Sequence, residues 1–155
     1  MTCVTAALAN DHPEKNSVHE TLSASRTITG TYLIFSGGFG PMILCVDDEQ
    51  RGLMVRKMLL ELQGHEVLTA LSGHEGLDLF VANPIEAVVL DYSMPGMNGD
   101  QVAAEMKRLK PEVKILLLSA FVDLPADALR YVDKRAVKGV SPTAFITELE
   151  QLLAS

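Results

Sequence analysis

Five polar residues stand where apolar runs end in this sequence: Asp47, Asp48, Asp91, Ser119 and Lys138. Carboxylates held together repel; a pair about 4 Å apart costs roughly 1 kcal/mol at the dielectric of water and about 4 kcal/mol at an effective dielectric of 20. Carboxylate oxygens suit Mg²⁺, and Lys138 adds one positive charge. A carboxylate beside Mg²⁺, an ammonium group and a hydroxyl can accept a phosphoryl group, with Asp91 as the nucleophile.

Each of these residues also has an ordinary explanation when it is taken alone. The paired aspartates can cap a helix, Asp91 and Ser119 can sit in turns, and Lys138 can be a surface charge. Their joint position favours the chemical interpretation, in which Lys138 neutralises the phosphoryl oxygens and Ser119 donates a hydrogen bond to one of them.

The apolar runs that precede these residues predict buried strands, because they are short, rich in β-branched residues and leucine, and ended by turn residues. Five strands are expected, at 42–46, 66–70, 86–91, 113–118 and 135–138.

Helices are predicted between the strands. The first helix is indicated by apolar residues at helical spacing before Gly64: Leu53, Val55, Met58, Leu59 and Leu62. Ser72 caps the next helix, which ends before Asn83 and Pro84. A third helix opens at Asn98 or Gly99 and stops at Pro111. A short fourth lies within 121–134, and Ser141 with Pro142 opens the fifth.

Strand and helix therefore alternate five times. This order predicts an α/β fold with a doubly wound, five-stranded parallel sheet, right-handed crossovers and helices on both faces. All carboxyl ends of parallel strands lie at one edge, so the five polar residues are expected to meet there.

Composition predicts a soluble globular protein: 155 residues are 48% hydrophobic and 21% charged, with a formal net charge of −7. The negative charge argues against direct nucleic-acid binding. Cys3 and Cys45 suggest neither a disulfide framework nor a zinc site, which indicates a reducing, cytoplasmic compartment. The uncharged stretch 28–46 is interrupted by glycines and a proline, so no transmembrane helix is expected.

Residues 1–41 carry no period that would build a core, and we expect a disordered or weakly ordered leader there, with a single domain over 42–155. Since Met42 stands directly before the first strand, a further hypothesis is that translation begins at Met42. The intact mass of the native protein tests it, and a mass that includes residues 1–41 would contradict it.

Three motifs resemble the receiver domain of two-component response regulators: Met-Ile-Leu-Cys-Val-Asp-Asp-Glu, Val-Val-Leu-Asp-Tyr-Ser-Met-Pro-Gly-Met-Asn-Gly and Leu-Leu-Leu-Ser-Ala, followed by Val-Lys-Gly. The resemblance covers about residues 42–155. It implies a flavodoxin-like sheet of order 2-1-3-4-5 with five helices, as in stand-alone receivers of the CheY type.

The resemblance also implies roles for single residues. Asp91 would accept the phosphoryl group from a histidine kinase or a histidine phosphotransfer protein. Asp48 and Asp91 would bind Mg²⁺ directly, Asp47 mostly through water, and the Ser93 backbone carbonyl would complete the protein ligands. A downstream target would bind the face made by the fourth helix, the fifth strand and the fifth helix.

Two positions depart from the family pattern. Lys138 precedes Gly139, where receivers usually have proline, so a cis peptide that orients the lysine loop is not expected. Receivers usually have an aromatic switch residue two positions before the lysine, and this position is Ala136 here. Tyr131 is nearby in the sequence but is not at the matching position. The phosphorylation chemistry is therefore expected to be intact, while the usual relay from hydroxyl to aromatic is not.

The first functional hypothesis is a stand-alone receiver that signals through a partner, since no output domain follows the fifth helix in this sequence. The second is a docking module that works without phosphorylation and keeps the acidic site as a relic. A third, a hydrolase of the haloacid dehalogenase type, needs a second aspartate two residues after the nucleophile, where this chain has Ser93.

Overall fold

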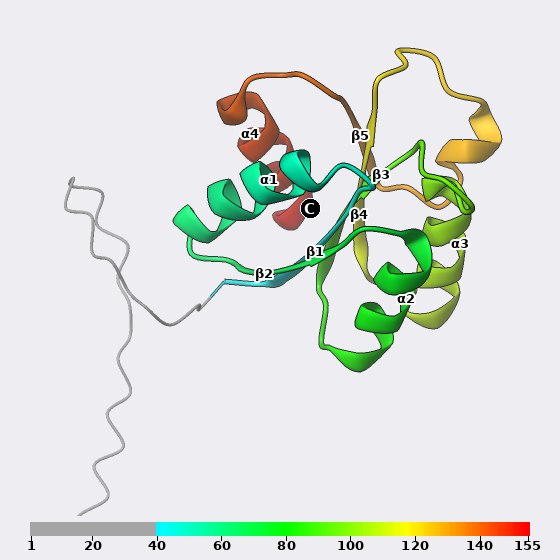
Figure 1. The fold of residues 1–155 in the computed structure, drawn as a ribbon, viewed down its shortest axis with the longest axis horizontal. Helices are drawn as coiled ribbons and strands as arrows, with labels where there is room; N and C mark the ends of the chain where they lie inside the picture. Colours follow the sequence, from blue (N-terminus) through cyan, green and yellow to red (C-terminus); the bar gives the residue numbers. More distant parts are fainter. Residues whose placement is uncertain (1–39) are drawn as a thin grey trace, which may run out of the picture. The chain divides into compact units, whose positions relative to one another are not determined.

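The computed structural model describes residues 40–155, which form an alternating α/β domain (Figure 1). The expected leader at 1–41 lies, except for its last two residues, outside the described part of the chain. The strands are β1 (Met42–Val46), β2 (Glu66–Ala70), β3 (Ala87–Asp91), β4 (Lys114–Ser119) and β5 (Lys134–Val137). The helices are α1 (Gln50–Leu62), α2 (Gly73–Ala82), α3 (Gly99–Leu109) and α4 (Pro142–Leu153), with the 3-10 turn η1 at Ala126–Leu129.

All five strands run parallel in the order β2-β1-β3-β4-β5, which confirms the predicted sheet. The strand β1 pairs with β2 on one side and with β3 on the other, and β4 and β5 follow β3 toward the far edge. β3 is the central strand, and all five of its residues are buried. The carboxyl end of β3 therefore lies between those of β1 and β4.

Alternate residues of the central strands face two separate cores. Leu44, Val88 and Leu117 pack with residues of α2 and α3, whereas Cys45 and Val89 face α1 and α4. Figure 1 shows the same layers, with α1 and α4 on one face of the sheet and α2 and α3 on the other. A continuous apolar run thus serves both faces, as expected for a parallel sheet covered by helices on both sides.

Ser72 and Ser141 cap the starts of α2 and α4, as the sequence predicted. The Ser72 hydroxyl accepts a hydrogen bond from the Glu75 N–H at 3.2 Å, and the Ser141 hydroxyl accepts one from the Ala144 N–H at the same distance. Pro142 occupies the first turn of α4, where its missing N–H costs no hydrogen bond. These caps fix where α2 and α4 leave the sheet.

The sequence predicted five helices, and the prediction of a short fourth one within 121–134 is wrong. The single 3-10 turn η1 takes its place, so the described residues contain four α-helices. In this segment only Ala128 is fully buried. Leu124, Leu129 and Val132 are only partly buried against the core, so little apolar surface supports a longer helix. The fifth strand also begins one residue earlier than predicted, at Lys134.

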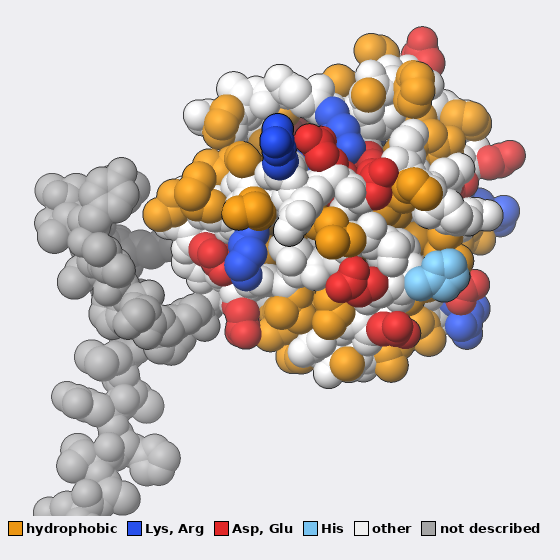
Figure 2. All heavy atoms as spheres, in the orientation of Figure 1, with side chains coloured by type: hydrophobic (Ala, Val, Ile, Leu, Met, Phe, Trp, Pro, Cys, Tyr) orange, Lys and Arg blue, Asp and Glu red, His pale blue; other side chains and the backbone are white. Residues whose placement is uncertain are grey.

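The buried face of α1 also differs from the one that the sequence predicted. Leu53 and Leu60 are buried, whereas Val55, Met58 and Leu62 are exposed. In Figure 2 hydrophobic side chains gather over α1 on the visible face of the domain. Within residues 40–155, no helix combines the length and the hydropathy that a membrane crossing needs.

Candidate functional site

Asp91 ends the central strand and is 2% exposed. The loop after it is held by two backbone hydrogen bonds of 2.8 Å, from the Tyr92 N–H to the Leu118 carbonyl and from the Gly99 N–H to the Tyr92 carbonyl. Position 99 accepts only glycine without rearrangement, because a Cβ there would lie 2.2 Å from the Asp91 carbonyl oxygen. The start of α3 is thereby packed directly against the backbone of Asp91.

Asp47 follows β1 and is also buried, at 1% exposed. Its Oδ1 accepts a hydrogen bond of 2.8 Å from the Glu49 N–H. Its Oδ2 accepts from both Lys138 and Arg56. Asp48, the next residue, is exposed. Carboxylate oxygens of Asp47, Asp48 and Asp91 all lie within 4.8 Å of one another, so the structure brings the three predicted carboxylates together.

Lys138 joins the two buried carboxylates. Its Nζ lies 2.9 Å from Asp91 Oδ1 and 3.0 Å from Asp47 Oδ2. The Lys138 N–H donates to the Ser119 carbonyl at 2.8 Å, which continues the pairing of β4 and β5 beyond the strand and fixes where the side chain starts.

The lysine loop has a local reason for its glycine. Gly139 has φ 87°, in the left-handed region that glycine adopts readily and that proline, fixed near −65°, cannot reach. The described residues contain no cis peptide bond. Lys138 reaches the carboxylates without one.

The carboxylates and the lysine shift each other's proton affinity. Burial raises the pKa of Asp91, and the neighbouring Asp47 adds to this, while the hydrogen bond from Lys138 and one from the Ser93 backbone act in the opposite direction. Burial alone would lower the pKa of Lys138, but its hydrogen bonds to Asp91 and Asp47 outweigh burial and raise that pKa. Lys138 is therefore charged at neutral pH.

Two predicted residues lie at the same edge without joining the ion-pair cluster. Ser119 ends β4 and is buried, and its hydroxyl accepts a hydrogen bond of 2.9 Å from the Phe121 N–H. Ser93 lies two residues after Asp91, and a hydrogen bond from its backbone lowers the Asp91 pKa, although less than Lys138 does. Both residues thus lie at the edge of the sheet where β3 and β4 end.

Arg56 was missed by sequence reasoning. It lies on α1, and its side chain, 15% exposed, forms an ion pair with Asp47. A signal for it does exist, because Arg56 stands three residues after Leu53 and four before Leu60, on the side of α1 that faces the sheet. A charged residue on a buried helical face requires a partner, and the buried carboxylate at the end of β1 is that partner.

A hollow of about 400 Å³ opens beside the cluster, between α1 and the segment from β5 to the start of α4. Its lining includes both cations of the cluster, Arg56 and Lys138, together with Gly52, Val55 and Phe145. The two positive side chains are thus reached from solvent on this side, while the carboxyl groups of Asp47 and Asp91 stay buried beneath them.

The response regulator receiver domain is the family whose profile matches this chain, over residues 43–153. The match covers more than half of the sequence, and the chain belongs to this family. Fold and site geometry agree with that assignment, since the sheet order is the one that the resemblance implied.

Solved structures and curated proteins give the same result. The response regulator TrrA of Thermotoga maritima, solved in complex with Mg²⁺–BeF, is 32% identical; the match covers 73% of this chain and 99% of TrrA, with a TM-score of 0.69. TrrA in complex with the histidine kinase ThkA matches at 33% identity, 74% and 99% coverage, and a TM-score of 0.67. The response regulator SaeR of Staphylococcus aureus is 38% identical over 78 residues, which are 50% of this chain but only 34% of SaeR.

Proposed function

We propose that this domain accepts a phosphoryl group on Asp91 from the phosphohistidine of a histidine kinase or a phosphotransfer protein, in a Mg²⁺-dependent reaction. The observation that carries the proposal is the placement of Asp91 at the sheet edge, with Lys138 2.9 Å away and the carboxylates of Asp47 and Asp48 beside it. In the transfer, an Asp91 carboxylate oxygen bonds to phosphorus while the phosphorus–nitrogen bond of the donor breaks, and the imidazole nitrogen keeps the electron pair.

The donor set fits the metal, because the three carboxylates offer only oxygen ligands within a span of 4.8 Å. Asp48, Asp91 and the Ser93 carbonyl would hold Mg²⁺ directly, and Asp47 mostly through water. When bound, the metal supplies positive charge that neutralises the phosphoryl oxygens. Lys138 adds its ammonium group from the β5 side, and Ser119 would turn its hydroxyl from accepting the Phe121 N–H to donating to a phosphoryl oxygen.

The phosphodonor in this proposal is a protein. TrrA, which matches this chain over 99% of its length, has been solved in complex with the histidine kinase ThkA. Met54, Val55 and Met58 of α1 are exposed apolar residues, and Val55 lines the hollow together with Arg56 and Lys138, so this part of α1 would offer a docking surface for the donor. We place this exchange in the cytoplasm, without direct contact to nucleic acid.

The output in this proposal is a protein–protein interaction that depends on phosphorylation. The face made by η1, β5 and α4 is the one expected to meet the target. The segment that links β4 to β5 exposes Phe121 and Val122 before η1 and Tyr131 after it. The Phe121 N–H donates to the Ser119 hydroxyl, so a change at Ser119 would act first on the start of this segment.

Intact mass after treatment with phosphoramidate and Mg²⁺ tests the proposed chemistry. The wild type should gain one phosphoryl group, and Asp91→Asn should gain none. Asp123→Asn, which removes an exposed carboxylate from the loop after β4, is the matched control and should gain the group like the wild type. Labelling that is the same in Asp91→Asn and in the wild type would contradict the assignment of Asp91.

A docking module without phosphorylation is the second candidate, and the 3-10 turn in place of a full helix is the observation that favours it. No gain of mass, under conditions that label TrrA, would support this candidate over the first. The hydrolase alternative remains disfavoured by Ser93, which stands where the haloacid dehalogenase type needs an aspartate.

A further inference from the structure

Arg56 and Lys138 share a single oxygen atom of the acidic site. Both the Arg56 guanidinium and the Lys138 ammonium donate to Asp47 Oδ2, while Asp47 Oδ1 accepts from the Glu49 N–H. Both oxygens of this buried carboxylate are therefore engaged by hydrogen-bond donors. A cation that approaches Asp47 Oδ2, directly or through a water molecule, meets an oxygen that already serves two positive groups.

The sequence around Arg56 is suited to hold it there. Gly52, one turn earlier on α1, leaves space for the guanidinium, because a Cβ at that position would lie 3.1 Å from Arg56 Nη2. Leu53 and Leu60 are buried on the same side of the helix. The charged end of Arg56 is therefore directed along α1 toward the carboxyl edge of the sheet, where Asp47 follows β1.

The formal charges show what Arg56 changes. Three carboxylates and Lys138 alone would give the site a charge of −2, which Mg²⁺ would balance to zero. With Arg56 the site carries −1, and Mg²⁺ would bring it to +1. Positive groups at this separation repel a divalent cation strongly, since the interaction scales with the product of the charges.

We propose that Arg56 is an internal counter-ion that competes with Mg²⁺ for Asp47. It thereby raises the Mg²⁺ concentration at which the metal site is half occupied. This inference rests on the Mg²⁺-dependent function proposed above. Arg56 also lines the hollow of about 400 Å³ beside the cluster. Its side chain can move into that space when the metal binds, without repacking Leu53 or Leu60. Occupancy of the site, and with it phosphorylation, then responds to the level of free Mg²⁺.

The test is the Mg²⁺ dissociation constant of the full chain, measured by isothermal titration calorimetry without a phosphodonor. Arg56→Gln removes the charge and should bind Mg²⁺ about tenfold more tightly. Arg51→Gln removes the same charge from an exposed position on α1, and its dissociation constant should stay within about twofold of the wild type. Binding by Arg56→Gln no tighter than the wild type, or equal tightening by Arg51→Gln, would overturn the proposal.

A second variant guards against loss of the fold. Arg56→Leu places an apolar side chain between the buried Leu53 and Leu60 and should also tighten Mg²⁺ binding about tenfold. A purely structural role of Arg56 predicts the opposite, weaker binding, because a disturbed α1 would no longer hold Asp47 and Asp48 in place.

Failure of the inference and failure of the proposed function give different results. Asp48→Asn and Asp91→Asn should abolish Mg²⁺ binding if the site is the one proposed. If the wild type itself shows no Mg²⁺ binding that depends on these aspartates, the proposed function fails. If it does and the Arg56 variants match the wild type, only the role of Arg56 fails.

Discussion

The acidic edge and the segment between β4 and β5 lie side by side but are built in opposite ways. At the acidic edge the carboxylates of Asp47 and Asp91 are buried, and each is paired with a cation. In residues 120–133, by contrast, Phe121 and Val122 are exposed, and the regular structure is limited to the four residues of η1. The acidic edge thus consists of buried and paired charges, whereas the neighbouring segment leaves part of its apolar side chains exposed.

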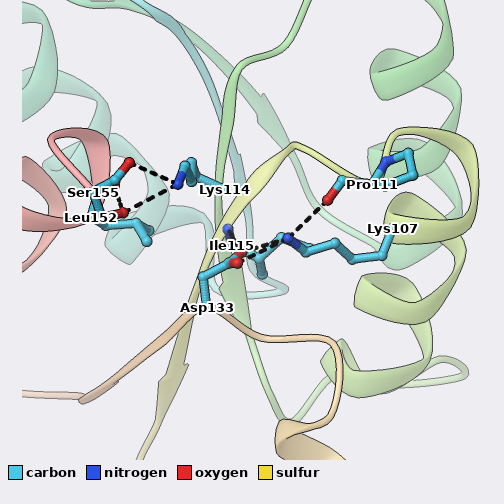
Figure 3. A network of polar contacts seen from close by, with 7 residues as sticks. All are labelled: Lys107, Pro111, Lys114, Ile115, Asp133, Leu152 and Ser155. Atoms are coloured by element: carbon cyan, nitrogen blue, oxygen red, sulfur yellow. Dashed lines mark hydrogen bonds and ion pairs between the residues drawn. The ribbon is translucent and has the colours of Figure 1, made fainter.

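The segment is held by hydrogen bonds at both ends, and Leu129 and Val132 pack against the core between them. At its start, the Phe121 N–H donates to the Ser119 hydroxyl. At its end, Asp133 accepts hydrogen bonds from the Ile115 N–H at 2.8 Å and from Lys107 at 3.0 Å, and Lys107 also donates to the Pro111 carbonyl (Figure 3). The Asp133 end lies at the amino edge of β4 and β5, away from Asp91. Only the Ser119 end is coupled to the chemistry.

The segment is expected to open at a lower free-energy cost than the acidic edge, because Phe121 and Val122 at its start are exposed. Regions with few buried apolar contacts open at low free-energy cost, whereas elements packed on both sides open only with the whole fold. In β5, Ala136 faces the core under α4, and the side chain that reaches the segment is Arg135, which donates to the Val122 carbonyl. Contact between β5 and the segment thus runs through Arg135.

The largest effect is expected from loss of the lysine at the acidic edge. Lys138→Met should slow labelling of Asp91 by phosphoramidate about 100-fold or more, because one of the charges that neutralise the phosphoryl oxygens is removed. Intact mass against time measures the rate. Lys134→Met, which removes a lysine paired with Glu148 on the surface, should label at the wild-type rate; equal slowing in both variants would show that the effect is not specific to the site.

The packing beneath the acidic edge should be nearly as sensitive. Gly99→Ala should lower the free energy of unfolding by about 3 kcal/mol, because the new Cβ would overlap the Asp91 carbonyl and the backbone there cannot yield. Urea denaturation provides the measurement. Gly52→Ala is the matched control and should change stability by less than about 1 kcal/mol, since its Cβ meets only the flexible end of Arg56. Similar losses in both would contradict this account of position 99.

A smaller effect is expected in the segment itself. Arg135→Ala removes the donor to the Val122 carbonyl and should speed amide hydrogen exchange in residues 121–124 about tenfold. Labelling at Asp91 should stay within about twofold of the wild type. Arg108→Ala, from an exposed ion pair on α3, is the control and should leave exchange in the segment unchanged. A large loss of labelling in Arg135→Ala would show that the two regions are not separable.

The least change is predicted for the thiol in the core below the site. Burial raises the pKa of Cys45 to about 12. The raised pKa favours the neutral thiol, so at pH 8 only roughly one molecule in ten thousand carries the reactive thiolate. Titration of Cys3→Ser with a thiol reagent should show no reaction in the folded state and one equivalent after unfolding. Rapid reaction of the folded protein would mean that the core opens beneath Asp47.

The sheet and its acidic edge could be predicted because both depend on local signals. Each strand is a short apolar run ended by turn residues, and the crossover rule then brings the ends of β1 and β3 to one edge. Asp47, Asp48, Asp91 and Lys138 meet there as the sequence predicted.

The exposed face of α1 and the role of Arg56 could not be predicted in the same way. α1 carries apolar residues on more than one side, so spacing alone does not show that Leu53 and Leu60 are buried while Met58 and Leu62 are exposed. The Arg56 pair joins residues nine positions apart through the turn after β1. The length of the helix around Ala128 depends on tertiary packing that Pro125 and the polar residues nearby do not reveal.

The most direct test of the account is to locate the phosphoryl group. After labelling with phosphoramidate and Mg²⁺, borohydride reduces an aspartyl phosphate to homoserine, and peptide mass spectrometry identifies the residue. The account predicts conversion of Asp91 alone. Conversion of another residue, or none in a protein that has gained phosphate, would contradict it.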